Sequence, residues 1–152
     1  QLYEGGIRTP TVVNWRGTLN PAQMEHPVQV VDWMPTLTAL TAATPPRDPR
    51  YDGRDIWPLV TGANTQPEPR RLYWNFQGDA NLALRAENWK LISSSREGRV
   101  RHELFDIAND PYEQHDQAAD HPDKVSELSE LIEQERPQDG SSARTDVTSP
   151  LV

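Results

Sequence analysis

Cysteine is absent from this chain of 152 residues. Disulfides, thiolate metal sites and cysteine nucleophiles are therefore excluded from these residues, and the redox compartment stays undetermined. Long apolar runs are also absent, so we find neither a membrane-spanning segment nor a signal peptide in the sequence. Only 35% of the residues are hydrophobic, and 14 prolines interrupt the chain. Because this is little apolar material for a free-standing core, we expect some apolar faces to need a partner layer from elsewhere.

Positive charge is scarce as well. The formal net charge is −8, and all but two of the 15 basic residues are arginines. An acidic chain is a poor binder of the phosphate backbone, so we expect no nucleic-acid partner, and we expect no membrane partner. The arginines favour fixed, bidentate contacts over diffuse positive charge.

The first part of the chain alternates short apolar segments with loops. Residues 11–15 predict a short buried strand, and residues 56–60 a short apolar turn. Asp32 is a favourable N-cap for a helix over residues 33–43. The apolar stripe of that helix consists of Met34, Leu37 and Leu40.

The hydrophobic period changes to two from Arg71 onward, which is typical of strands. The expected strands are residues 71–76, 81–86, 89–93 and 101–105. Their short connections favour antiparallel neighbours. Residues 122–135 predict a helix that covers one side of this sheet. Its apolar face consists of Val125, Leu128, Leu131 and Ile132.

The opening segment packs an aromatic residue, a carboxylate, a glycine pair, an arginine and a proline into Tyr3-Glu4-Gly5-Gly6-Ile7-Arg8-Thr9-Pro10. A glycine pair beside ionisable groups indicates a sharp turn or a close backbone approach. The alternative is a plain surface turn that leads into residues 11–15. Since the first residue is Gln1 and not Met, we expect the chain to be a portion of a longer protein.

Further short motifs follow this segment in order. Together the motifs are Tyr3-Glu4-Gly5-Gly6-Ile7-Arg8-Thr9-Pro10, Val31-Asp32-Trp33-Met34-Pro35-Thr36-Leu37, Asp52-Gly53-Arg54-Asp55-Ile56 with Leu59, Leu72-Tyr73-Trp74, Leu84-Arg85 with Trp89-Lys90-Leu91-Ile92, Glu103-Leu104-Phe105-Asp106, Asp110-Pro111-Tyr112-Glu113 and Asp116-Gln117-Ala118. In this order and spacing, the chain resembles the C-terminal portion of a sulfatase of the arylsulfatase and N-acetylgalactosamine-6-sulfatase kind, over residues 1–135.

The resemblance implies an alkaline-phosphatase-like α/β fold. Residues 1–63 would then be the trailing segment of the large catalytic α/β domain, and residues 64–70 a linker. Residues 71–136 would form a C-terminal subdomain in which a four-stranded antiparallel sheet packs on a helix. Residues 137–152 are rich in Ser, Thr, Asp and Pro, and we expect a disordered tail there.

The resemblance also implies hydrolysis of sulfate esters by a formylglycine, made from a cysteine, beside a calcium ion. In the family, the sulfate-binding lysine lies four residues before the aromatic of the glycine-pair motif, which here is two residues upstream of Gln1. The cysteine, the metal ligands and the catalytic histidines lie further upstream still. The residues present would therefore hold no catalytic group and no calcium, and we expect them to be inactive alone. The substrate would be a sulfated small molecule or glycan, and family habit indicates a periplasmic or secreted parent.

Four residues are candidates for the site. Glu4 and Arg8 flank the glycine turn, where they could pair with each other or brace the neighbouring loop; we predict a supporting role. In similar sulfatases the turn after residues 71–76 approaches the leaving group of the substrate. Asn75 and Gln77 are therefore our specificity candidates, and the alternative for both is a solvent-facing hairpin tip.

An oxygen-rich cluster in residues 106–116 invites a metal assignment. It consists of Asp106, Asp110, Glu113, His115 and Asp116. The cluster lacks the glycine and the alternating ligand spacing of a calcium loop, and turn formation explains the same residues. We predict no metal there and no catalytic histidine, and we interpret Trp33, Trp57 and Trp89 as core residues.

Two other functions stay open at this point. The first is a phosphate or phosphonate monoester hydrolase of the same superfamily, because anion choice is set by groups upstream. The second is a noncatalytic binding or scaffold module, which predicts cooperative unfolding and saturable binding of a ligand.

Overall fold

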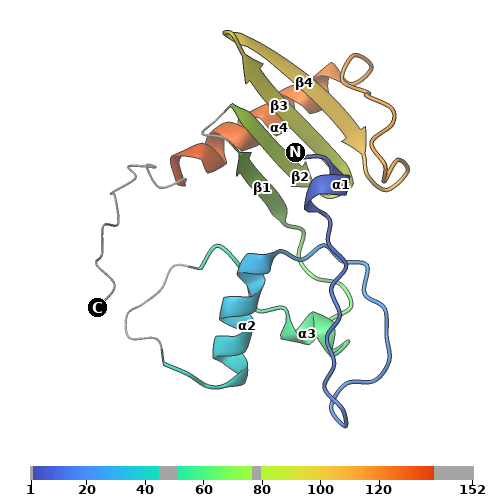
Figure 1. Ribbon diagram of the computed structural model, residues 1–152, viewed down its shortest axis with the longest axis vertical. Coiled ribbons are helices and arrows are strands. Elements are labelled where there is room, and N and C mark those ends of the chain that lie inside the picture. Colours follow the sequence, from blue (N-terminus) through green and yellow to red (C-terminus); the bar gives the residue numbers. More distant parts are fainter. Residues whose placement is uncertain (1, 45–50, 77–79, 139–152) are drawn as a thin grey trace, which may run out of the picture. The chain divides into compact units, whose positions relative to one another are not determined.

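The computed structural model describes residues 2–44, 51–76 and 80–138, in two compact units (Figure 1). The sheet unit comprises the described residues of Gln1–Thr9 and Pro69–Val152. The helical unit is Pro10–Glu68, again in its described part. The glycine turn at the start of the chain thus belongs with the sheet, although residues 10–68 separate the two in sequence. The assignment of residues 1–63 to a larger catalytic domain stays a prediction.

The sheet has four antiparallel strands in the order β1-β2-β3-β4, as predicted. The strands are β1 (Arg71–Phe76), β2 (Asn81–Ala86), β3 (Trp89–Arg96) and β4 (Arg99–Asp106). β3 and β4 are longer than predicted, because their pairing continues up to Arg96 and Arg99. Between them, Glu97 (φ 52°) and Gly98 (φ 75°) both take the left-handed conformation, and such a tight turn keeps the flanking strands in register.

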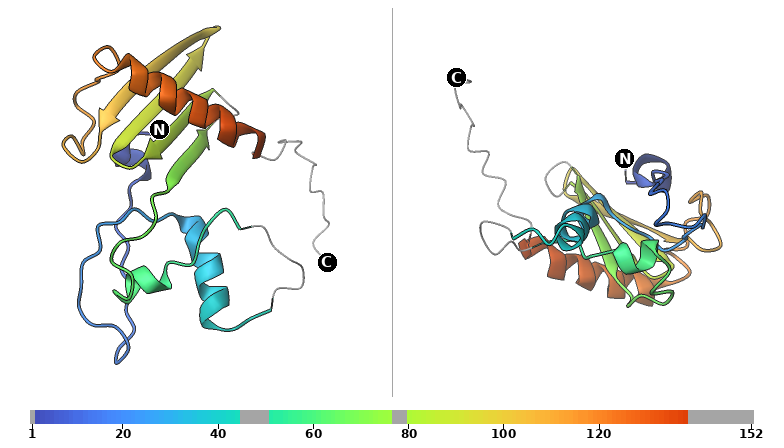
Figure 2. Two further views of the ribbon diagram at one scale, coloured as in Figure 1. Left: turned by 180° about the vertical axis from the view of Figure 1, so that it is seen from behind. Right: turned by 90° about the horizontal axis from the view of Figure 1, so that it is seen from below.

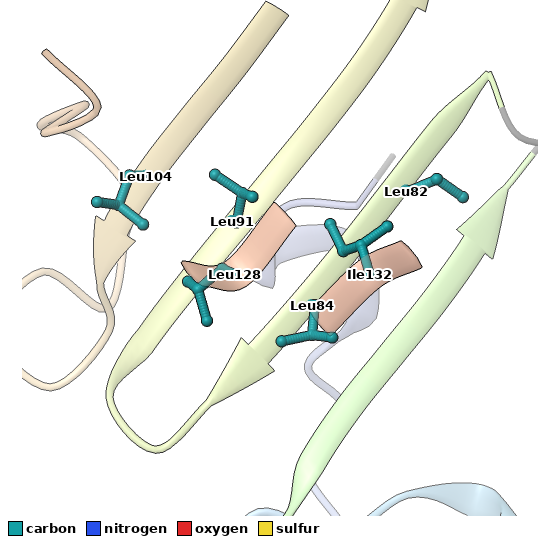
Figure 3. Packing of buried hydrophobic residues seen from close by; sticks show 6 residues of the cluster. All are labelled: Leu82, Leu84, Leu91, Leu104, Leu128 and Ile132. Carbon is teal, nitrogen blue, oxygen red and sulfur yellow. The ribbon is translucent and has the colours of Figure 1, made fainter. Parts of the chain in front are cut away.

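One face of the sheet is covered by α4 (Pro122–Glu135), which is followed by the short 3₁₀ helix η2 (Arg136–Gln138) (Figure 2). The buried cluster between α4 and the sheet contains Leu82, Leu84, Leu91, Leu104, Leu128 and Ile132 (Figure 3). Val125 and Leu131 pack against this cluster, so the predicted apolar face of the helix is confirmed.

The opposite face of the sheet is covered by the start of the chain. Leu2 is buried in a second cluster with Ala83, Ile92, Phe105 and Ile107. The one-turn helix α1 (Glu4–Ile7) follows directly. The sheet is therefore buried on both sides, which accounts for the apolar residues at successive positions of β2 and β3.

In the helical unit the strand predicted over residues 11–15 is wrong. These residues have no regular secondary structure, and Val12 is 90% exposed. A strand needs a neighbouring strand for its backbone hydrogen bonds, and the described residues of this unit provide none. The apolar pattern of the segment was a local signal without the partner that a strand requires.

The helix of this unit, α2 (Trp33–Leu40), is preceded by the 3₁₀ turn η1 (Val30–Asp32). The helix ends before the predicted residue 43, and Ala42 has a left-handed φ of 50°. Met34 and Leu37, two members of its apolar stripe, are 62% and 53% exposed. A second short helix, α3 (Trp57–Val60), occupies the predicted apolar turn.

Asp32 is the N-cap residue of α2, as predicted, but its side chain accepts no hydrogen bond from the first turn of that helix. Instead its buried carboxylate accepts from the backbone N–H of Gln29 (2.7 Å) and of Arg54 (3.0 Å). The Thr36 hydroxyl accepts from the backbone N–H of Ile56 at 2.9 Å. These two side chains attach the segment after Gly53 to the start of α2.

The tryptophans predicted as core residues, Trp33, Trp57 and Trp89, are half-buried, and Trp89 packs against the cluster under α4. Among the described residues no helix combines the length and the apolar character that crossing a bilayer requires.

Candidate functional site

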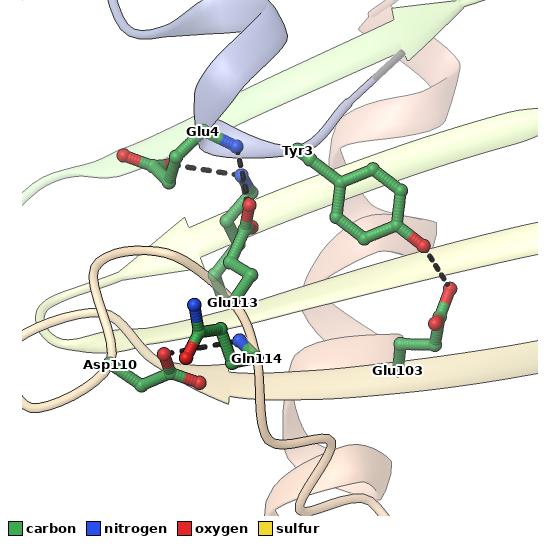
Figure 4. A network of polar contacts seen from close by, with 7 residues as sticks. Tyr3, Glu4, Glu103, Asp110, Glu113 and Gln114 are labelled. Atoms are coloured by element: carbon green, nitrogen blue, oxygen red, sulfur yellow. Dashed lines mark hydrogen bonds and ion pairs between the residues drawn. The ribbon is translucent and has the colours of Figure 1, made fainter.

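The glycine turn is attached to the sheet through a buried lysine. Lys90 Nζ lies 2.8 Å from Glu4 Oε1 and 2.7 Å from Glu113 Oε1. Figure 4 shows the Glu4 and Glu113 side chains. The Lys90 side chain is fully buried, and 7% of the Glu4 side chain and 2% of the Glu113 side chain are exposed. An ammonium group at this depth is stable only when it is paired, and here it is paired on two sides.

Strand geometry places this lysine under the turn. Trp89 and Leu91 belong to the α4 side of β3, so Lys90 and Ile92 point to the side of Leu2 and α1. The ring of Trp74 lies 5.8 Å from Lys90 Nζ and adds a cation–π contact. The backbone N–H of Glu4 donates to Glu113 Oε2, so the loop after β4 holds the turn by its backbone as well.

Tyr3 makes a second attachment to the sheet. Its hydroxyl donates to Glu103 Oε2 at 2.8 Å. The centroids of the Tyr3 and Phe105 rings are 6.2 Å apart, in an edge-to-face arrangement. Arg101 Nη2 donates to the other oxygen of Glu103 at 3.0 Å. Burial raises the pKa of the Tyr3 phenol, and the hydrogen bond to the Glu103 carboxylate raises it further.

Of the two predicted supporting residues, Glu4 pairs with Lys90 and not with Arg8. Arg8 is exposed, and its guanidinium has no ion-pair partner within the described ranges. Burial lowers the pKa of the Arg85 guanidinium in β2. The negative charge of Glu4 raises this pKa, and the positive charge of Arg8 lowers it. The supporting role of Glu4 and Arg8 in a catalytic site stays a prediction.

One specificity candidate, Asn75, lies near the end of β1. Asn75 is exposed, and it precedes the last residue of that strand. Gln77 lies outside the described residues. Their proposed contact with a leaving group therefore stays a prediction.

The oxygen-rich cluster is used for loop structure. Asp106 accepts from the backbone N–H of Ala108, and Asp116 accepts from those of Leu104 and Ala118. Within residues 2–44, 51–76 and 80–138 no three His, Asp or Glu side chains are grouped to hold a metal ion.

Asp110 closes the loop next to Glu113. Its carboxylate accepts from the backbone N–H groups of Gln114 (3.1 Å) and His115 (2.8 Å). The Gln114 hydrogen bond lowers the pKa of Asp110, and the His115 backbone and side chain lower it further. The loop that carries Glu113 is thereby closed on itself.

Sequence reasoning missed the roles of Lys90, Glu113 and Glu103. One signal for Lys90 was available: it stands in an otherwise apolar strand segment, at a position whose neighbour two residues on, Ile92, is buried. The partners of Lys90 carry no such signal, because Glu4 lies 86 positions away from it in sequence.

The comparisons with known proteins agree with one another. The family model described as N-sulphoglucosamine sulphohydrolase, C-terminal, matches residues 1–138. N-acetylgalactosamine-6-O-sulfatase of Bacteroides thetaiotaomicron is 29% identical over 143 residues, which are 86% of this chain and 28% of that protein. Steryl-sulfatase of Rattus norvegicus is 36% identical over 94 residues, which are 61% of this chain and 16% of that protein.

A solved structure of Ps i-CgsB in complex with k-i-k-neocarrahexaose is 26% identical with a TM-score of 0.55. The match covers 72% of this chain and 24% of that one. The chain thus spans less than a third of the length of each of these three proteins.

Proposed function

The chain belongs to the sulfatase family, as its C-terminal portion, and from this premise we propose that the parent protein hydrolyses sulfate esters. The observation that carries the proposal is the family match over residues 1–138. The sheet and α4 correspond to the C-terminal subdomain of the alkaline-phosphatase-like fold of this family.

The catalytic groups proposed for the parent are a formylglycine and a calcium ion, both in residues that precede this chain. Calcium prefers several oxygen ligands, and within the described residues no three Asp, Glu or His side chains are grouped to supply them. In the oxygen-rich cluster, Asp116 and Asp110 accept from backbone N–H groups, and Glu113 pairs with Lys90. We therefore assign no step of the reaction to a metal bound by this chain.

For the substrate we propose a sulfated sugar or a sulfated small molecule. Two of the similar proteins support a sugar: one is named N-acetylgalactosamine-6-O-sulfatase, and the structure of the other contains k-i-k-neocarrahexaose. Asn75 and Gln77 are the proposed specificity residues. Glu4 and Arg8 are the proposed supporting residues beside the glycine turn.

The test is an assay of the full-length parent protein with an aryl sulfate and an aryl phosphate of the same leaving group. We expect the aryl sulfate to be cleaved faster. The control is the parent in which the cysteine of an upstream Cys-x-Pro/Ala-Ser-Arg stretch is replaced by alanine; it should be inactive. Faster cleavage of the phosphate would favour a phosphate or phosphonate monoester hydrolase. A parent without that stretch and without activity would contradict the proposal and favour a binding or scaffold module.

A further inference from the structure

The buried ion-pair cluster of Glu4, Lys90 and Glu113 connects three segments that lie far apart in sequence. Lys90 comes from β3, Glu4 from α1 and Glu113 from the loop after β4. None of these residues carries a catalytic group in the proposed function, and the cluster is closed to solvent. Its place in the fold therefore needs its own explanation.

Stability alone is a weak explanation. The removal of two carboxylates and one ammonium from water has a large desolvation cost, and apolar side chains of similar volume are often as stable in such places. The alternative contribution of a buried ion pair is registry, since its attraction depends steeply on position and direction.

Few other contacts on this surface supply registry. The buried contacts of Leu2 with the cluster that contains Ala83 and Ile92 are apolar, and the hydrogen bond from Tyr3 to Glu103 is only partly buried. Apolar contacts are non-directional, so they tolerate several positions of the segment. The ion pair between Lys90 and Glu4 forms only when Glu4 lies at one position on the sheet. The hydrogen bond from the Glu4 N–H to Glu113 holds the backbone of the turn at that position.

The fixed turn then determines the path of the chain that enters it. The N–H groups of Gly6 and Ile7 donate to the carbonyl of Tyr3, and that of Arg8 donates to the carbonyl of Glu4. The Tyr3 hydroxyl is held by Glu103. A shift of Glu4 therefore moves Tyr3 and Leu2 with it.

We propose that Lys90 is a positioning residue of the parent enzyme: it holds Glu4, and thereby fixes the direction in which the chain that precedes Leu2 reaches the sheet. The inference rests on the proposed function, which places the catalytic groups in residues that precede this chain. A displacement of about 1 Å at a reacting centre reduces catalysis by about 10²-fold, so a residue remote from the chemistry has a measurable effect.

The experiment compares Lys90→Met, Lys90→Arg and Glu113→Gln in the full-length parent. Activity on the aryl sulfate is expressed per folded molecule, with the folded fraction measured by circular dichroism. We expect Lys90→Met and Glu113→Gln to lower kcat/KM by about 10- to 100-fold, and Lys90→Arg to restore part of the loss. Glu113→Gln removes one of the two charges that hold Lys90 and weakens the acceptor of the Glu4 N–H, so it also loosens the turn and serves as the test if Lys90→Met does not fold.

The matched control is Leu128→Ala, a truncation on the α4 side of the sheet. It should lower the urea concentration at which half of the protein unfolds and leave kcat/KM per folded molecule unchanged. If Glu113→Gln and a folded Lys90→Met keep the wild-type kcat/KM, the inference is wrong, whereas the proposed function stands.

Amide hydrogen exchange separates the inference from the proposed function. If the wild-type parent does not cleave the aryl sulfate, the proposed function fails, and the amides of Gly6, Ile7 and Arg8 decide the inference. Faster exchange at these amides in Glu113→Gln, without the same change in Leu128→Ala, supports the registry role. Wild-type exchange at the turn in Glu113→Gln overturns it.

Discussion

At the scale of single residues, Tyr3 and Glu103 form a contact whose strength should depend on pH. Because the pKa of Tyr3 is raised in the folded state, its contribution to stability is complete below the unfolded value of about 10. The contribution is lost as the pH rises through the higher folded value. We expect Tyr3→Phe to lower the unfolding free energy near pH 8, because the variant loses the hydrogen bond to Glu103. The loss should be only about 1 kcal/mol, since solvent screens this partly exposed contact. The difference between wild type and variant should shrink above pH 10, as measured by urea unfolding at several pH values.

Tyr112→Phe is the control for this measurement. Tyr112 is 82% exposed and belongs to the same unit, so the variant should have the wild-type unfolding free energy at pH 8. If the difference in unfolding free energy between wild type and Tyr3→Phe stays constant from pH 8 to 11, the assigned role of the phenol is wrong.

The residue scale is also where prediction from sequence was weakest. Glu4 was identified as a candidate from its place beside two glycines, but its partner was not. Lys90 and Glu113 meet Glu4 only because the register of β3 and the closed loop after β4 bring them together. No spacing along the chain carries that information.

At the scale of elements, Gly53 joins the start of α2 to the segment that follows it. A Cβ atom at Gly53 would lie 2.2 Å from the Val31 carbonyl oxygen and 2.6 Å from the Asp32 nitrogen. Both are backbone atoms, so Gly53→Ala must displace the main chain, at a cost of about 1–3 kcal/mol or more. We expect faster amide exchange at Arg54 and Ile56, whose N–H groups donate to Asp32 and Thr36.

Gly5→Ala is the control, since a Cβ atom at Gly5 would have no other atom within 4 Å. It should be neutral or stabilise α1 slightly, because alanine favours helix more than glycine does. Unchanged exchange at Arg54 and Ile56 in Gly53→Ala would show that the Val31 contact is not restrictive.

Elements were predicted well where their signal is local. The two-residue period of β1 to β4 and the helical period of α4 can be recognised from residues that are close in sequence. The packing of α4 on the sheet follows from the apolar face of this helix. Residues 11–15 carry a similar apolar pattern and form no strand. The difference lies in the partner strand, which no local pattern specifies.

At the scale of the whole molecule, the two units differ in how much apolar surface they bury. The sheet unit has a buried cluster on each face of its sheet. In the described part of Pro10–Glu68 the buried apolar residues are Ile56 and Leu59, whereas Val12, Met34 and Leu37 are exposed. Regions with few buried apolar contacts open at low free energy, so the two units should differ in local stability.

We therefore expect the 152-residue chain, expressed alone, to exchange its amides at two rates. The amides of β2, β3 and α4 should be slowest, and those of Gly6, Ile7 and Arg8 should follow the sheet, because Glu4 and Leu2 attach them to it. The amides of residues 10–44 should exchange at least about tenfold faster. Hydrogen–deuterium exchange with peptide-level mass spectrometry measures all of these segments in one experiment. Uniform protection from Thr11 through Ile132 would contradict the prediction, because it would require the helical unit to be as stable as a sheet that is buried on both faces.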